Sequence, residues 1–189
     1  MKGIASGLQK HGVLIFSLAV ACLVSGCATA AGPTILSDYG ANWGVTGRGG
    51  QRPVFHGGID FAASGGDPIF AAAPGEVSEV FDSAEVVDVY VSGVRGWCGI
   101  GALVRHAADF STLYCHFSSR AVRLGDQVAR GQLIGGAGRS GFSANVVHLH
   151  FTVLEGGVVM NPHRFLTAGC FDPGKAYPDL KALTYPVKC

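Results

Sequence analysis

The chain has 189 residues, of which 48% are hydrophobic and 14% charged, and its formal net charge is +1. A near-neutral chain without a run of Lys and Arg lacks the basic surface of nucleic-acid-binding proteins, which excludes nucleic acid as the main partner. The length predicts one compact domain, and the 29 glycines favour a mainly β fold with tight turns over a helical bundle or a disordered chain.

The N-terminus has the features of an export signal. Two early lysines precede an apolar run over residues 13–24, which is too short for a comfortable membrane span. The run ends in small residues directly before Cys27. This pattern resembles the lipobox of bacterial lipoproteins more than an ordinary signal peptide cleaved a few residues later. The resemblance implies a signal over 1–26, lipidation of Cys27 and, because Ala28 follows, anchoring at the periplasmic face of the outer membrane. Several acyl chains would make that anchor stable.

Residues 27–52 are interpreted as the lipidated N-terminus and an irregular tether. Over residues 53–167, short apolar runs alternate with turn residues, as in a small antiparallel sheet or sandwich with few helices. The tail, 168–189, is expected to be irregular. Strands are expected at 86–91, 101–106, 111–116, 131–134 and 148–153, with a hairpin joining the second and third and a short helix at 163–167.

Four cysteines remain once Cys22 leaves with the signal and Cys27 is lipidated. An exported chain with four cysteines predicts two disulfides, for which three connectivities exist. The first two flank the expected hairpin and the last two bracket the tail, which favours pairing within each set. A thiolate metal site lacks the usual Cys-x-x-Cys spacing. The four are Cys98, Cys115, Cys170 and Cys189.

The stretch His148-Leu149-His150 is the first candidate for chemistry. On a strand, where side chains alternate between faces, His148, His150 and Thr152 point one way and the apolar residues between them point the other way. His-x-His on an apolar strand is more often incidental than a metal site, so this motif needs further groups.

His56 and Asp60 supply such groups upstream. Gly57-Gly58 between them makes a helix unfavourable. A strand end that bends at the glycines would instead bring both side chains to one point. Two imidazoles and one carboxylate with an open fourth position form a catalytic zinc arrangement, and the same set could be the facial triad of an iron oxygenase.

His116 is a fourth candidate. If Leu113 and Cys115 face the core, Tyr114 and His116 share the opposite face of the strand. Coincidence is a poor explanation for so many suitable groups at strand and turn edges of one small β domain.

From His56 to Pro162 the sequence resembles the lysostaphin-type (LytM-like) zinc peptidases, which cut peptidoglycan peptides. The resemblance implies that His56, Asp60 and His150 bind zinc and that His116 and His148 are catalytic. One of the two would move the proton between water and the leaving amine, and the other would stabilise the oxyanion. The motifs that carry the resemblance are His56 to Ala63, Pro68-Ile69 with Ala71-Ala72, Gly75 to Val77, Thr112 to Ser118, Val122 to Gly135 and His148 to Phe151.

We therefore expect a zinc endopeptidase that hydrolyses peptidoglycan cross-links, with peptidoglycan peptide and, through the lipid, a membrane as partners. The alternative is a binding or amidase-activating module, but such relatives lack ligand residues and this chain keeps all five groups. A biotinyl-type carrier lacks its lysine at the turn within 122–134, and an iron oxygenase lacks matching sequence elsewhere. The loop at 143–147 departs from the family pattern, and His106 and His163 are interpreted as structural. No pattern in the sequence indicates an oligomeric state.

Overall fold

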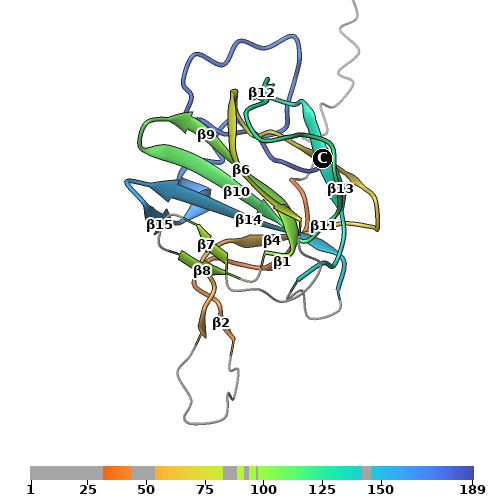
Figure 1. Ribbon diagram of the computed structural model, residues 1–189. Helices are drawn as coiled ribbons and strands as arrows, with labels where there is room; N and C mark the ends of the chain where they lie inside the picture. The colour runs from red at the N-terminus through yellow and green to blue at the C-terminus, as the bar shows by residue number, and fades with distance from the viewer. Residues whose placement is uncertain (1–31, 44–53, 83–88, 92–93, 97, 142–145) are drawn as a thin grey trace, which may run out of the picture.

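A computed structural model describes residues 32–43, 54–82, 89–91, 94–96, 98–141 and 146–189 (Figure 1). The predicted signal, the lipidation site Cys27 and most of the loop at 143–147 lie outside these ranges. In the described part of the chain, the only helix is one turn of 3-10 helix, η1 (Pro162–Arg164), and no helix is long and apolar enough to cross a membrane. The predicted mainly β, antiparallel fold is confirmed.

The largest sheet has eight strands, all paired antiparallel. Its order is β1-β4-β14-β10-β9-β6-β12, and β15 pairs with the far end of β14 (Figure 1). The strands are β1 (Ile35–Ser37), β4 (Ile59–Ala62), β6 (Gly75–Asp82), β9 (Ile100–Ala107), β10 (Phe110–Cys115), β12 (Gln127–Val128), β14 (His148–Glu155) and β15 (Val158–Met160).

A second sheet of three strands has the order β11-β13-β5. Two further ribbons of two strands each, β2 with β3 and β7 with β8, complete the described strands. Their bounds are β11 (Phe117–Arg120), β13 (Leu133–Ala137), β5 (Pro68–Phe70), β2 (Asn42–Trp43), β3 (Val54–Phe55), β7 (Val89–Val91) and β8 (Val94–Gly96).

The hydrophobic core takes fully buried side chains from both sheets. Phe61, Tyr114 and Phe151 come from the large sheet, and Phe117 and Ile134 come from the small one. Burying aromatic and branched side chains between sheets is the main stabilising contribution in such a domain. The same packing fixes which face of β4, β10 and β14 is turned away from the core.

The predicted hairpin forms, with β9 and β10 pairing antiparallel from Ala107 opposite Phe110. The interpretation of residues 27–52 as irregular is wrong for their described part, residues 32–43, which contains two strands. β1 pairs with β4 and β2 pairs with β3. A strand of two or three residues at a sheet edge is held by backbone hydrogen bonds and shows no alternation that a sequence pattern could reveal.

The helix predicted at 163–167 is shorter than expected. It is the single turn η1, capped by Asn161 Oδ1, which accepts a hydrogen bond from the His163 N–H at 3.0 Å. The chain leaves helical geometry there because Phe165 and Leu166 turn into the core.

The tail at 168–189 has no strand apart from one bridge between Gly169 and Thr184, in agreement with the predicted irregular structure. A disulfide joins Cys170 to Cys189. The Arg130 guanidinium, 7% exposed, donates hydrogen bonds to the carbonyl oxygens of Ala72 and Ala182 at 2.6 and 2.8 Å. The tail is thereby fastened to the core.

Candidate functional site

The site lies where β4 and β14 pair. Asp60 is directly opposite His150 in the register, and His56 lies just before β4. A Cβ atom on Gly58 would lie 2.5 Å from the Phe151 carbonyl oxygen and 2.8 Å from His150 Cε1. Only glycine allows so close an approach, which brings His56 around to the face that carries His150.

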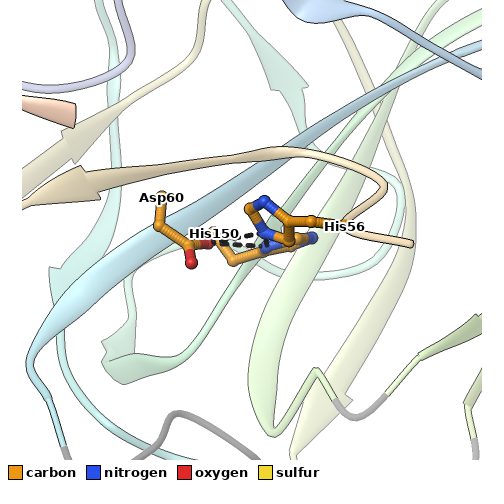
Figure 2. Close-up of side chains that lie close together, drawn as sticks. All are labelled: His56, Asp60 and His150. Carbon is orange, nitrogen blue, oxygen red and sulfur yellow. Dashed lines mark hydrogen bonds and ion pairs between the residues drawn. The ribbon is translucent and has the colours of Figure 1, made fainter. Parts of the chain in front are cut away.

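Three polar atoms converge on one point (Figure 2). Asp60 Oδ1 lies 3.1 Å from His56 Nε2 and 2.8 Å from His150 Nδ1, and the two ring nitrogens are 3.0 Å apart. The described residues contain no other group of three or more His, Cys, Asp or Glu side chains placed to hold a metal. Two imidazole nitrogens and one carboxylate oxygen are a ligand set that suits zinc.

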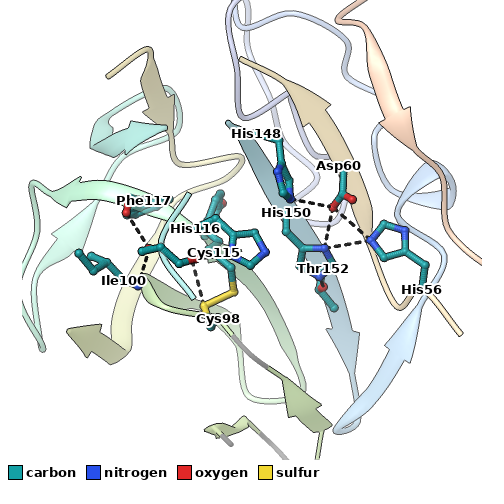
Figure 3. The surroundings of a disulfide bond; sticks show 12 residues. His56, Asp60, Cys98, Ile100, Cys115, His116, Phe117, His148, His150 and Thr152 are labelled. Atoms are coloured by element: carbon teal, nitrogen blue, oxygen red, sulfur yellow. Dashed lines mark hydrogen bonds and ion pairs between the residues drawn. A yellow bond between two sulfur atoms is a disulfide. The ribbon is translucent and has the colours of Figure 1, made fainter. Parts of the chain in front are cut away.

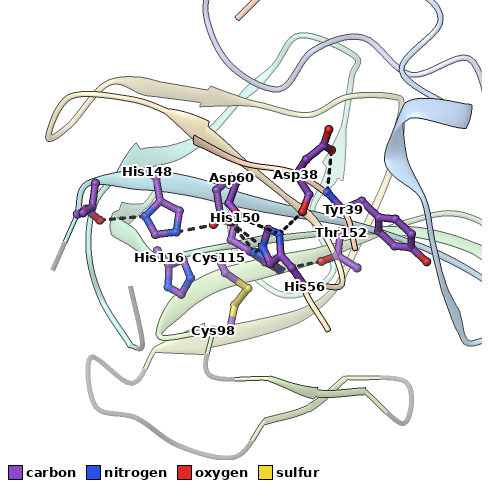
Figure 4. Close-up of polar contacts among 12 residues, drawn as sticks. Asp38, Tyr39, His56, Asp60, Cys98, Cys115, His116, His148, His150 and Thr152 are labelled. Atoms are coloured by element: carbon purple, nitrogen blue, oxygen red, sulfur yellow. Dashed lines mark hydrogen bonds and ion pairs between the residues drawn. A yellow bond between two sulfur atoms is a disulfide. The ribbon is translucent and has the colours of Figure 1, made fainter. Parts of the chain in front are cut away.

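The ring nitrogens of His56 and His150 that point away from this site also have partners. The carbonyl oxygen of Asp38 accepts a hydrogen bond from His56 Nδ1 at 2.8 Å, and Thr152 Oγ1 lies 3.0 Å from His150 Nε2 (Figure 4). Because a carbonyl can only accept, His56 Nδ1 carries a proton, so Nε2 is the atom of the neutral ring that is able to bind a metal. Such outer partners fix ring orientation and are typical of metal-binding histidines, so the residues present fit the ion.

His148 and His116 lie beside these three residues. His148 Nε2 is 3.6 Å from Asp60 Oδ1, and its Nδ1 donates to the Val146 carbonyl oxygen at 2.9 Å. The His116 ring centroid is 4.7 Å from that of His148 and 5.8 Å from that of His150. The structure therefore brings together all five residues that the sequence singled out.

The predicted facing of β10 is wrong. Tyr114 points into the core and is fully buried, whereas Leu113 and Cys115 lie on the opposite face in a second, smaller apolar cluster. Simple alternation would then turn His116 into the core. It reaches the site because its φ is +66°, the only positive φ of a non-glycine residue in the part of the chain that the structure describes.

Burial and neighbouring groups shift several pKa values. Burial lowers the pKa of His116 to about 3, and the nearby imidazoles of His150 and His148 act in the same direction. Burial alone would raise the pKa of Asp60, but hydrogen bonds from His150 and His56 outweigh it and hold that pKa below its ordinary value. At neutral pH the site therefore presents a carboxylate and a neutral His116 ring.

The two histidines interpreted as structural lie away from this group. His106 lies between the Pro74 carbonyl oxygen and Thr112 Oγ1, at 2.7 and 2.8 Å, and His163 Nε2 lies 2.8 Å from Asp38 Oδ1. Sequence reasoning missed the contributions of Asp38 and Ser140, whose backbone carbonyls accept hydrogen bonds from the rings of His56 and His116. A backbone carbonyl has no residue-specific signal in a sequence.

Comparison with known proteins places the site within a known family. The model of peptidase family M23 matches residues 54–162, which contain all five residues described above.

Three curated relatives show the range of the family. The chain is 35% identical over 107 residues to lipoprotein NlpD of Yersinia enterocolitica, covering 57% of this chain and 97% of the relative. Identity to the peptidoglycan DD-endopeptidase ShyC of Vibrio cholerae is 33% over 107 residues, covering 57% and 22%. Identity to the murein hydrolase activator NlpD of Salmonella dublin is 30% over 132 residues, covering 70% and 29%. The chain thus spans less than a third of the last two proteins.

Two solved structures share the fold. The catalytic domain of the prophage-encoded M23 protein EnpA of Enterococcus faecalis superposes with a TM-score of 0.55 at 32% identity, covering 69% of this chain and 89% of that one. A zinc-containing peptidase from Vibrio cholerae has a TM-score of 0.56 at 29% identity, covering 70% and 36%. The resemblance to lysostaphin-type peptidases is confirmed.

Proposed function

The chain belongs to peptidase family M23, and from this premise we propose that it is a zinc endopeptidase that hydrolyses peptide cross-links of peptidoglycan. One observation carries the proposal: the convergence of His56, Asp60 and His150 on one point, with two more histidines beside them. The family's named peptidoglycan endopeptidases support the same substrate class.

We assign the metal to His56 Nε2, Asp60 Oδ1 and His150 Nδ1. Zinc held there would supply Lewis acidity, which would polarise a peptide carbonyl and lower the pKa of water to about 7. His56 and Asp60 are buried, and both imidazoles have a partner at the ring nitrogen away from the site, which holds the donors in place before an ion binds.

His148 and His116 are the candidates for proton transfer and for positioning the reactants. Each ring donates a hydrogen bond from its Nδ1–H to a backbone carbonyl, so in the neutral ring the lone pair is on Nε2. His148 Nε2 lies 3.6 Å from Asp60 Oδ1, which puts this nitrogen directly beside the proposed metal ligands. We therefore assign His148 as the group that accepts the proton of the attacking water and passes it to the leaving amine nitrogen, and His116 as the group that orients the reactants.

The test is a digest of purified sacculi by the zinc-loaded chain, with products identified by mass spectrometry. The parent should release cleaved cross-links, and the masses identify the bond. His150→Ala and Asp60→Asn should release none, whereas Asp109→Asn, which neutralises an exposed carboxylate remote from the site, should match the parent. Intact sacculi after incubation with a folded, zinc-loaded parent would refute the enzyme proposal.

A second candidate function comes from the relative named as a murein hydrolase activator. A non-hydrolytic module would stimulate an added amidase on the same sacculi while releasing no cleaved cross-links by itself. The five retained groups favour hydrolysis, because an activator has no need of a complete ligand set.

We also propose that the chain is anchored through a lipid on Cys27, at the periplasmic face of the outer membrane. The sequence pattern before Cys27 supports this proposal, and so does the likeness to a protein named as a lipoprotein. Metabolic labelling with a fatty acid should mark the parent and not Cys27→Ala, and membrane fractionation should separate the two forms.

A further inference from the structure

His116 needs external support, because it lies at a junction in an unfavourable backbone conformation. It is the single residue between β10 and β11, where the chain passes from the large sheet to the small one. Its φ of +66° is in the left-handed region that side chains with a Cβ rarely adopt. Some neighbouring group must therefore hold it there.

The Cys98–Cys115 disulfide lies directly beside this residue (Figure 3). Cys115 precedes His116 and is the register partner of His150, so the disulfide shares a sheet face with a proposed metal ligand. The Cys98 carbonyl oxygen also accepts a hydrogen bond from the His116 backbone N–H at 2.9 Å. Both cysteines are at most 3% exposed.

Ser140 supports His116 from the other side. Its carbonyl oxygen accepts a hydrogen bond from His116 Nδ1 at 2.7 Å. Its hydroxyl donates a hydrogen bond to the Phe117 carbonyl oxygen at 2.7 Å and accepts one from the Ile100 N–H at 2.8 Å, which connects the segments that follow His116 and Cys98. Gly99 completes the contact, since a Cβ there would lie 2.4 Å from the backbone of Ser140.

We propose that the Cys98–Cys115 disulfide and Ser140 are positioning groups that hold His116 in its left-handed conformation, with its imidazole beside those of His148 and His150. This inference rests on the proposed peptidase function for its kinetic consequence. Its structural content is independent of turnover, because the support of the His116 ring can be measured directly.

The chain contains a matched control. The Cys170–Cys189 disulfide closes a loop of similar length, with a sequence separation of 19 against 17, and lies in the tail. The loop-closure contributions to the unfolding temperature should be alike, and C98A/C115A should lose somewhat more because its two cysteines are buried in an apolar cluster. Only removal of Cys98–Cys115 should disturb His116.

The experiment compares the full chain, purified in detergent and loaded with zinc, with the double variants C98A/C115A and C170A/C189A. Cross-linked muropeptide dimers serve as substrate. C98A/C115A should lose about tenfold to 100-fold in kcat, with KM within about twofold and zinc content unchanged. C170A/C189A should keep its kcat within about twofold. Equal kcat values in the two double variants would overturn the proposal.

A second readout needs no activity. In the parent, the His116 imidazole N–H, held by the Ser140 carbonyl, should give a proton–nitrogen NMR signal protected from solvent exchange, and this signal should disappear in C98A/C115A. Persistence of the signal would overturn the proposal even if the parent proves inactive on peptidoglycan. Loss of the signal with an inactive parent would sustain the positioning role and refute only the peptidase function.

If C98A/C115A does not fold, the variants Ser140→Ala and Ser140→Thr test the proposal instead. Alanine removes both hydroxyl hydrogen bonds and should lower kcat and weaken the protected signal, while threonine should restore both. Equal behaviour of the alanine and threonine variants would contradict the role of Ser140.

Discussion

His150 is held at both ring nitrogens, and the two contacts have different consequences. Nδ1 faces Asp60 at 2.8 Å, while Nε2 lies 3.0 Å from the hydroxyl of Thr152, which is itself buried. In the proposed zinc-bound form, Nδ1 would present its lone pair to the ion, so Nε2 would carry the proton and donate a hydrogen bond to Thr152 Oγ1. The Thr152 hydroxyl would therefore orient the His150 ring through the nitrogen that does not face the proposed metal.

Thr152→Val, which keeps the shape and removes the hydroxyl, should weaken zinc binding by about 10-fold to 100-fold. The measurement is competition for zinc against a chelator of known affinity. Thr152→Ser retains the acceptor and serves as the control. Unchanged zinc affinity in the valine variant would show that the hydroxyl does not support the ligand.

Gly58→Ala should destabilise the fold by about 1–3 kcal/mol, because the new methyl group meets backbone and side-chain atoms at 2.5–2.8 Å. Urea unfolding of the metal-free chain measures the effect. Gly65→Ala is the matched control, since no atom lies within 4 Å of the position that its Cβ would take. If the two variants were equally stable, the close approach of Gly58 to β14 would not matter for folding.

At the level of single residues, the sequence singled out five side chains that the structure brings together. Imidazole and carboxylate side chains are the usual metal-binding and proton-transfer groups, so their residue types can be read directly from the sequence. This applies to His-x-His and to the His and Asp on either side of Gly57-Gly58. The facing of His116 was not predictable, because alternation along β10 ends at a left-handed residue that only tertiary contacts enforce. The carbonyl partners at Asp38 and Ser140 were missed for the related reason that every residue has a carbonyl.

Among the elements, the tail depends most on one side chain. Arg130 is 7% exposed, it donates to the carbonyls of Ala72 and Ala182, and its guanidinium lies 4.6 Å from the Tyr177 ring centroid. A planar cation with several donors can satisfy carbonyls from two segments at once, which joins the core to the tail.

Arg130→Ala should lower the free energy of unfolding by about 3 kcal/mol, because it leaves buried carbonyl oxygens without their charged donor. Urea unfolding gives the magnitude, and limited proteolysis should cut first within residues 171–182. Arg123→Ala, at an exposed position, should change stability by less than about 0.5 kcal/mol. A tail that resists proteolysis in the Arg130 variant would argue against this role.

The elements themselves were predictable where apolar alternation is strong. The hairpin of β9 with β10 and the strand β14 follow directly from their side-chain patterns. The short strands β1, β2 and β3 were not, since pairing at an edge depends on a partner that lies elsewhere in the chain. For the same reason, the division of the strands into two sheets becomes visible only in the assembled fold.

For the molecule as a whole, acid should weaken the fold partly through His106. Burial lowers the pKa of His106 to about 4, whereas an unfolded histidine titrates near its ordinary value of about 6.5. Between these pH values the unfolded chain binds more protons than the folded one, so stability falls as pH falls from about 6.5 to about 4. Below that range both states are protonated and this contribution stops changing.

Urea unfolding of the metal-free chain at several pH values between 7.5 and 4 should therefore show a declining midpoint. His106→Gln should flatten the decline, by at most about 1.4 kcal/mol per pH unit. Parallel profiles for parent and variant would mean that other groups, such as His116 with its pKa of about 3, account for the acid sensitivity.

The strand β1 has a mechanical consequence for the site. β1 is at the edge of the large sheet and pairs with β4, and it ends one residue before Asp38, whose carbonyl accepts a hydrogen bond from His56. A pulling force that enters the domain through residues 32–34 therefore loads β1 first and displaces Asp38 before the deeper core responds. The contact of Asp38 Oδ1 with His163 braces this point from the opposite end of the chain. If the chain is anchored through Cys27 as proposed, tension in the segment before β1 would pass through β1 and Asp38 to the orientation of His56.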